Sequence, residues 1–217
     1  MFYQEKTNKP GNMIVINFKT YKTGKKALVL AKKLSKVSKK VIFAVPAPDI
    51  YSIAHKVKNP IFTEHVDYFE PNRHTGAILP EDIKSNGAKG SLINHSERKL
   101  TLKEIKLTIN RCKKLNLKTI VCASNLKEAK KIDKFKPDFI AYEPPELIAG
   151  NISVSKAKPD IIKKVIKQIK TPLLVGAGIK DKKDLQIAKE LGAKGILISS
   201  AIINNIHPER VLRRLLN

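Results

Sequence analysis

Polar residues able to do chemistry stand at the ends of five apolar runs in this chain. A carboxylate held close to a carbon in a dry site is able to remove a proton from it, and Glu143, which precedes two prolines, suits such a base. The chemistry indicated is catalysis by a carboxylate base. The five segments are residues 17–19 (Asn-Phe-Lys), 94–98 (Asn-His-Ser-Glu-Arg), 143–145 (Glu-Pro-Pro), 176–178 (Gly-Ala-Gly) and 199–200 (Ser-Ser).

The elements that must bring these segments together alternate between short apolar runs and amphipathic stretches. The runs predict strands at residues 13–18, 41–45, 60–65, 90–94, 118–123, 138–142, 172–176 and 195–199. Apolar spacing, prolines and capping residues predict helices at 23–37, 50–57, 125–135, 158–170, 181–191 and 208–216, with two more beginning at Pro80 and after Thr101.

Such alternation allows either a closed parallel (β/α)8 barrel or an open doubly wound sheet. The polar segments follow the first, fourth, sixth, seventh and eighth strands, and only a closed barrel brings all of those ends together. We therefore predict an α/β fold of the closed (β/α)8 type. Residues 1–217 are expected to form one domain, with residues 1–12 as a polar lead-in.

The formal charge of +24 over 217 residues raises the question of a nucleic-acid partner. The lysines, however, occur as pairs spread over successive helices without interleaved aromatic residues, so a solvated basic exterior that attracts small anions is the favoured interpretation. Residues 1–15 lack the layout of a secretory signal and no apolar run approaches the roughly 18 residues of a membrane span, so we expect a cytoplasmic protein without a membrane partner. Cys112 and Cys122 are expected to be reduced and buried, without metal.

The segments INFKTY, NHSERK, AYEPPELI and GAGI resemble motifs of the triosephosphate isomerase family, in the same order and over nearly the whole chain from Ile14. The short archaeal form is the most similar. The resemblance implies a TIM barrel that interconverts dihydroxyacetone phosphate and glyceraldehyde 3-phosphate through an enediolate, with no cofactor and no metal. This family is itself a standard example of a base, a neutral histidine and a closing loop acting together.

The resemblance also implies a role for each site residue. Glu143 is the base and His95 the electrophile, Lys19 places a positive charge beside the enediolate and the phosphate, Glu97 holds Lys19 by an ion pair, and Asn17 positions the backbone. The phosphate is expected on backbone N–H groups after the sixth, seventh and eighth strands. The residues concerned are Ala149, Gly176, Gly178, Ser199 and Ser200.

A loop around Thr75, with His74 and Gly76, corresponds to the arm that enters a neighbouring subunit, which implies a homodimer or a homotetramer. Two departures from the family stand out. Residues 149–151 read Ala-Gly-Asn where the family commonly has Gly-Thr-Gly, which bears on the closing loop. Ser199 and Ser200 replace two glycines, and Gly178 replaces a common serine, although backbone donors need no particular side chain.

Simpler interpretations stay open from the residues alone. Lys19 could be one more solvated lysine, His95 a capped loop residue, Glu97 a first-turn carboxylate, and the Gly-Ala-Gly segment a plain strand-to-helix turn. Two other functions compete with the isomerase. One is another phosphate-binding barrel enzyme of sugar-phosphate metabolism, which usually needs an aspartate pair or a Schiff-base lysine, and the other is a basic barrel that binds nucleic acid.

Overall fold

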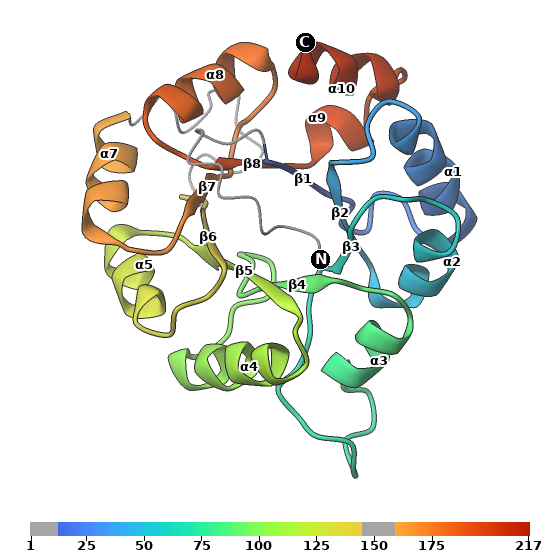
Figure 1. Cartoon of the computed structure of the whole chain (residues 1–217), viewed down its shortest axis with the longest axis vertical. Helices are drawn as coiled ribbons and strands as arrows, with labels where there is room; N and C mark the ends of the chain where they lie inside the picture. Colours follow the sequence, from blue (N-terminus) through green and yellow to red (C-terminus); the bar gives the residue numbers. More distant parts are fainter. Residues whose placement is uncertain (1–12, 145–158) are drawn as a thin grey trace.

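Eight parallel strands form a closed barrel in the computed structural model, which describes residues 13–144 and 159–217 (Figure 1). Neighbours in the sequence are neighbours in the sheet, and the pairing of Met13 with Gly195 joins the last strand to the first. This pairing excludes the open sheet and confirms the predicted barrel. The strands are β1 (Met13–Asn17), β2 (Ile42–Val45), β3 (Ile61–Thr63), β4 (Gly90–Ile93), β5 (Lys118–Ala123), β6 (Phe139–Tyr142), β7 (Leu173–Val175) and β8 (Gly195–Ile198).

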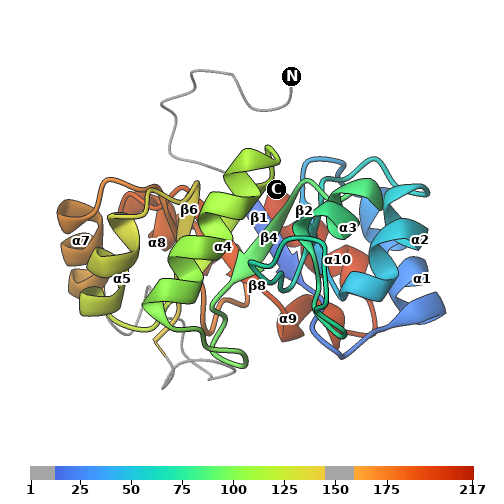
Figure 2. The same cartoon turned by 90° about the horizontal axis from the view of Figure 1, so that it is seen from below.

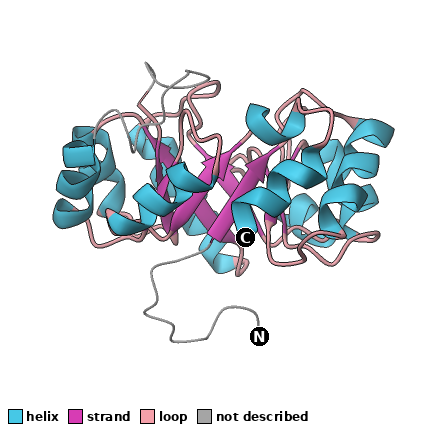
Figure 3. Ribbon diagram, turned by 90° about the horizontal axis from the view of Figure 1, so that it is seen from above, coloured by secondary structure: helices cyan, strands magenta, loops and turns pink. Residues whose placement is uncertain are grey.

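Helices surround the barrel as an outer layer, with the strands at the centre in both side views (Figures 2 and 3). They are α1 (Gly24–Ser35), α2 (Ile50–Ala54), α3 (Pro80–Ser85), α4 (Leu102–Lys114), α5 (Leu126–Asp133), α7 (Pro159–Gln168), α8 (Lys182–Glu190), α9 (Ser200–Ile203) and α10 (Pro208–Leu216), with a 3-10 turn, η1 (Ala47–Asp49), before α2. The predicted helices all occur, most of them shorter by one to three residues at an end, where a last turn frays. The turn η1 and the helix α9 were not predicted, because three or four residues are too few for a helical period.

Alternate residues of each strand separate two apolar layers. Inward side chains fill the barrel, and outward side chains pack under the helices, as the two-residue period of a strand requires. The interior layer consists of Val15, Ile42, Ala44, Phe62, Leu92, Ile120, Cys122, Ala141, Leu174 and Leu197. These buried side chains make the interior of the barrel a packed core.

Local capping residues fix where several helices begin. The Thr101 hydroxyl accepts the Glu104 N–H at 3.2 Å, and the Glu104 carboxylate accepts the Thr101 N–H at 2.7 Å, which is the predicted capping box of α4. Asp181 caps α8 in the same reciprocal way. The rim loops before these helices are therefore held at their helical ends.

The connection from Glu64 to Leu79 carries no helix or strand and projects beyond the ring of helices (Figure 1). Its base is closed by Asp67, whose backbone N–H donates to the Ile78 carbonyl and whose carboxylate accepts the Ile78 N–H, both at 2.8 Å. Phe69 stacks on His74 with ring centroids 4.2 Å apart. The loop is thus an ordered projection whose tip, around Thr75, is exposed.

Two further sequence predictions concern the cysteines and membrane-spanning helices. Cys112 and Cys122 are both buried and unpaired, as predicted. None of the helices in residues 13–144 and 159–217 combines the length and the apolar character needed to cross a bilayer.

Candidate active site

A cavity of about 490 Å³ opens at the carboxyl ends of the strands, where active sites of this fold lie. Predicted site residues from five loops line it: Asn17, Lys19, His95, Glu143, Gly178, Ser199 and Ser200. Glu97 and Gly176 are not part of this lining, but Glu97 is bonded to Lys19, and a Cβ added at Gly176 would meet Glu143. Ala149 lies outside the described residues, as do Gly150 and Asn151.

Lys19 occupies a backbone conformation that favours glycine. Its φ of 47° is stabilised by its N–H, which donates to the Asn17 side-chain oxygen at 3.0 Å. The Asn17 carbonyl in turn accepts the Ser199 hydroxyl at 2.7 Å, so β1 and β8 are tied together at the rim. The Lys19 ammonium lies 2.6 Å from Glu97 and is only 14% exposed, whereas Glu97 is 60% exposed. The turn therefore holds a cation inside the cavity with its partner carboxylate at the edge.

His95 is oriented by the residue two positions further on. The Glu97 N–H donates to His95 Nδ1 at 3.2 Å, so Nδ1 is an acceptor and the proton of the neutral ring lies on Nε2. Nε2 faces Glu143, with 3.9 Å between it and the carboxylate Oε2. His95 is buried, at 7% exposure. The ring thus presents an N–H donor to the cavity.

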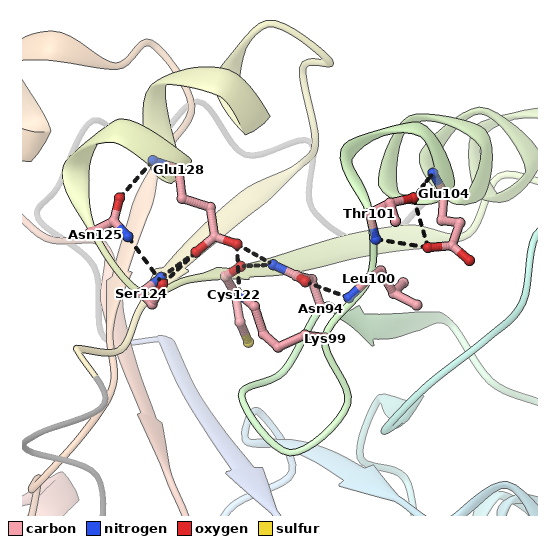
Figure 4. A network of polar contacts seen from close by, with 9 residues as sticks. All are labelled: Asn94, Lys99, Leu100, Thr101, Glu104, Cys122, Ser124, Asn125 and Glu128. Atoms are coloured by element: carbon pink, nitrogen blue, oxygen red, sulfur yellow. Dashed lines mark hydrogen bonds and ion pairs between the residues drawn. The ribbon is translucent and has the colours of Figure 1, made fainter.

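A polar network around Asn94, the residue before His95, holds the loop that carries both residues (Figure 4). Asn94 donates to the Cys122 carbonyl at 2.8 Å and to Glu128 at 2.9 Å, and its own oxygen accepts the Leu100 N–H at 2.9 Å. The backbone of Asn94 is left-handed, with a φ of 60°. These bonds satisfy a buried amide and fix the direction in which the next residue, His95, points.

Glu128 anchors the other side of this network. It accepts the Ser124 N–H at 2.8 Å, the Ser124 hydroxyl at 2.6 Å and the Lys99 ammonium at 2.6 Å (Figure 4). Burial by itself raises the pKa of Glu128, but the bonds from Lys99, Ser124 and Asn94 outweigh it and lower that pKa to about 2. Sequence reasoning missed this role, because 34 residues separate Glu128 from Asn94.

Glu143 is buried at 6% exposure, and its Oε2 has no hydrogen-bond partner among the described residues. A methyl group at Gly176 would lie 2.4 Å from Glu143 Cγ, so the glycine makes room for the side chain. The Cys122 thiol lies below, where burial, followed by the nearby Glu143 carboxylate, raises its pKa well above the usual value. One carboxylate oxygen is therefore free to accept a proton from a molecule in the cavity.

The far side of the cavity is built from backbone. Ala177 and Gly178 both have positive φ, of 66° and 69°, which turns the chain sharply after β7. Ser199 and Ser200 follow β8, at the start of the unpredicted helix α9. Arg214 of α10 and Tyr21 also line the cavity and were not singled out from the sequence. Tyr21 lies two residues beyond Lys19, but Arg214 carries no local signal, because its helix is placed beside the rim only by the closed fold.

A closed parallel barrel with a carboxylate, an imidazole and an ammonium group around one rim cavity is a (β/α)8-barrel enzyme. The comparisons with known proteins specify which. Residues 12–213 match the sequence model of the triosephosphate isomerase family. Among curated relatives, the triosephosphate isomerase of Methanocaldococcus jannaschii is 40% identical over 94% of this chain and 98% of its own, and that of Saccharolobus solfataricus is 44% identical over 92% of each. The chain belongs to the triosephosphate isomerase family.

The fold is also similar to that of a solved member of the family. The solved triosephosphate isomerase of Bartonella henselae superposes with a TM-score of 0.71, covering 88% of this chain and 93% of that one, at 19% identity. At that identity the superposition establishes the barrel alone. The resemblance found in the sequence is confirmed, and none of the comparisons supports another phosphate-binding enzyme or a nucleic-acid-binding barrel.

Proposed function

We propose that this protein catalyses the reversible interconversion of dihydroxyacetone phosphate and D-glyceraldehyde 3-phosphate. The observation that carries the proposal is the facing pair of Glu143 Oε2 and His95 Nε2, 3.9 Å apart across the cavity. The first atom is an acceptor without a partner among the described residues, and the second is a donor. A substrate carbon and its carbonyl oxygen need those two complementary groups.

The reaction follows from these groups. Glu143 takes a proton from the carbon beside the carbonyl, the C–H electrons form a carbon–carbon double bond, and the carbonyl oxygen becomes the anionic oxygen of an enediolate. The His95 Nε2–H and the Lys19 ammonium stabilise that charge. His95 gives its Nε2 proton to the anionic oxygen and takes one from the neighbouring hydroxyl oxygen, which becomes the new carbonyl oxygen. Glu143 returns its proton to the adjacent carbon, so that both groups end unchanged. Glu97 and Asn17 keep Lys19 in place.

The substrate phosphate is assigned to the backbone on the opposite side of the cavity. The N–H groups of Gly178, Ser199 and Ser200 supply donors there, and the positive field of the chain favours an anion. Gly176 is assigned to the same turn and leaves space for the base. Ala149, which lies outside the described residues, is proposed to add a donor from the loop after β6.

Replacement of the base tests the mechanism. We expect Glu143→Gln to lower kcat by about 10²–10⁴-fold in a coupled assay with glyceraldehyde 3-phosphate, since the amide cannot accept the proton. Glu190→Gln changes a carboxylate of equal length on the exposed end of α8 and should leave kcat unchanged. A Glu143→Gln enzyme with near-wild-type kcat would remove Glu143 from the mechanism.

The setting of the enzyme is proposed on the same basis. We infer that residues 1–217 form a single barrel domain, that the enzyme acts in the cytoplasm in glycolysis and gluconeogenesis, and that it is a homodimer or homotetramer. The ordered, exposed loop around Thr75 supports the assembly, because an arm of this shape is suited to enter a second copy.

A charged side chain at the tip of the arm tests that interface. Thr75→Arg should shift the sedimentation of the enzyme toward the monomer, because a long cation cannot be buried without a partner. Ser85→Arg places the same side chain at an exposed site at the end of α3 and should leave the assembly intact. Unchanged sedimentation of Thr75→Arg would place the interface elsewhere.

A further inference from the structure

A groove on the outside of the barrel lies between α1 and the segment that joins α9 to α10. It has a volume of about 340 Å³, and α1 and α10 lie side by side there (Figure 1). Its floor is apolar and buried, formed by Leu30 of α1, Ile203 of α9 and Pro208 of α10. The groove adjoins the catalytic cavity at Asn205, but none of the residues assigned to catalysis or to the phosphate lines it. Hollows between helices are a common place for binding sites.

Two exposed aliphatic side chains line the same groove. Val29 on α1 is 55% exposed, and Ile206, before α10, is 88% exposed. They are the two most exposed large aliphatic residues in the part of the chain that the structure describes. Single exposed apolar residues are ordinary, but two that share a groove with an apolar floor form a continuous apolar surface, which is typical of an interaction site.

The remaining charge around this apolar surface is positive. Four lysines line the groove, and none of them forms an ion pair with a described residue: Lys22, Lys25, Lys26 and Lys33. No aspartate or glutamate belongs to the described lining, and residues 13–48 contain neither. Asp49 contacts the start of α1, but both of its oxygens accept the Gly24 N–H at 2.9 Å. The groove therefore offers apolar surface and uncompensated positive charge together.

We propose that this groove is a docking site for an acidic amphipathic helix of another protein. The apolar face of such a helix would fill the groove, as in other helix-in-groove complexes, and its carboxylates would lie against the lysines. Along α1, the distance from Lys25 to Lys33 is about 12 Å, which matches about two turns of a partner helix. Charge complementarity of this kind steers association and selects acidic partners over basic ones.

Two other occupants match the groove less well. A second copy of this chain also carries a net charge of +24, so contact through this face would place lysines opposite lysines. An anionic bilayer matches the charge, but its flat surface contacts protruding side chains and leaves a hollow unfilled. A convex, acidic segment satisfies both the shape and the charge of the groove.

The probe is a fluorescein-labelled helical peptide of about 15 residues, with leucine on one face and glutamate on the other. Fluorescence anisotropy measures its binding to the wild-type enzyme. Two comparison peptides replace every glutamate by lysine, or keep the composition and distribute the leucines over all faces. We expect the acidic amphipathic peptide to bind at least about tenfold more tightly than either, and added salt to weaken it. Failure of this peptide to bind would overturn the inference.

Charge reversal separates the groove from the general positive field. Lys25→Glu combined with Lys26→Glu should weaken binding of the acidic peptide roughly fivefold to tenfold, because two attractive contacts become repulsive. Lys163→Glu combined with Lys164→Glu makes the same change in net charge at exposed positions of α7 and should weaken it less than about twofold. Equal weakening by the two double substitutions would overturn the inference. Thermal unfolding checks that each variant is folded, whether or not the enzyme is an isomerase.

Removal of an apolar wall tests the other half of the surface. Ile206→Gln should weaken binding about tenfold, the value of burying most of one aliphatic side chain. Tyr51→Gln removes a side chain that is 61% exposed on α2 and should leave binding unchanged. Vesicles of phosphatidylserine and phosphatidylcholine test the bilayer. Vesicle binding that depends on Ile206, without binding of the acidic peptide, would assign the groove to a membrane and overturn the inference.

Discussion

Gly176→Ala should slow the enzyme by moving its base. Gly176 directly follows β7 and its N–H donates to the Tyr142 carbonyl at 3.0 Å, so the backbone is held against the neighbouring strand. A Cβ at this position would lie 2.4 Å from Glu143 Cγ, 2.8 Å from Oε1 and 2.9 Å from Cδ. Its φ is not in the left-handed region, so alanine itself fits the backbone. The collision with Glu143 is therefore the whole effect of the substitution.

The size of the effect follows from the displacement. Ordinary contact begins at 3.4 Å, so Glu143 Cγ must retreat by 1.0 Å from the new methyl group (3.4 minus 2.4). A misplacement of about 1 Å in a reacting group costs about 10²-fold in rate, which is about 2.7 kcal/mol of transition-state stabilisation. We expect the loss in kcat, with KM for glyceraldehyde 3-phosphate changed by less than about threefold, because the N–H groups of Gly178, Ser199 and Ser200 assigned to the phosphate do not move.

Gly192→Ala is the matched control in the same assay and in urea unfolding. Gly192 follows α8, far along the chain from the base, and the nearest atom to a new Cβ is Ile166 Cδ1 at 3.6 Å. Its φ of 98° strains alanine, so the control should lose about 1 kcal/mol of stability while keeping its kcat. If Gly176→Ala keeps wild-type kcat, or if the control loses as much kcat, the steric argument is wrong.

Two stability predictions use the shifted carboxyl groups. Burial raises the pKa of Glu64 from 4.5 to about 8, so the free energy of unfolding of the wild type falls as pH rises through that range. Glu64→Gln removes the ionisable group and should therefore raise the free energy of unfolding by roughly 2–3 kcal/mol at pH 7 in urea titrations. Near pH 4 the same substitution should change it little. The pKa of Glu128 is lowered to about 2, so its contribution is present above pH 4.5 and is lost as pH falls toward 2. Glu128→Gln should cost about 1–2 kcal/mol at pH 7 after allowance for solvent screening, and less in acid; an unchanged or reversed pH dependence contradicts either prediction.

Much of the barrel could be predicted because its local signals agree with its global form. The apolar runs gave strands such as Lys118–Ala123 at their observed bounds, and the Thr101 capping box marked the start of α4. The short helix α9 is different. Four residues after Ser199 show no helical period, and the helix forms there because the chain must turn back over the rim of the closed barrel.

The site was only partly predictable, for a related reason. His95, Glu143 and Lys19 carry recognisable chemistry at strand ends, so their types and order were sufficient to single them out. Glu64 also follows a strand, but it is one of 19 acidic residues, and what sets it apart is a buried carboxyl oxygen without a partner among the described residues. Burial of this kind arises from register and closure, which no local pattern contains.

The pairing of charges explains how a base and a cation share one cavity. If Lys19 paired with Glu143, the ammonium group would stabilise the carboxylate and make it a weaker base. In the structure Lys19 instead pairs with Glu97 at 2.6 Å, and the Glu97 N–H also sets the ring of His95. Glu97 thus holds the cation and the imidazole at once from an exposed position, and Glu143 keeps an oxygen without a partner among the described residues.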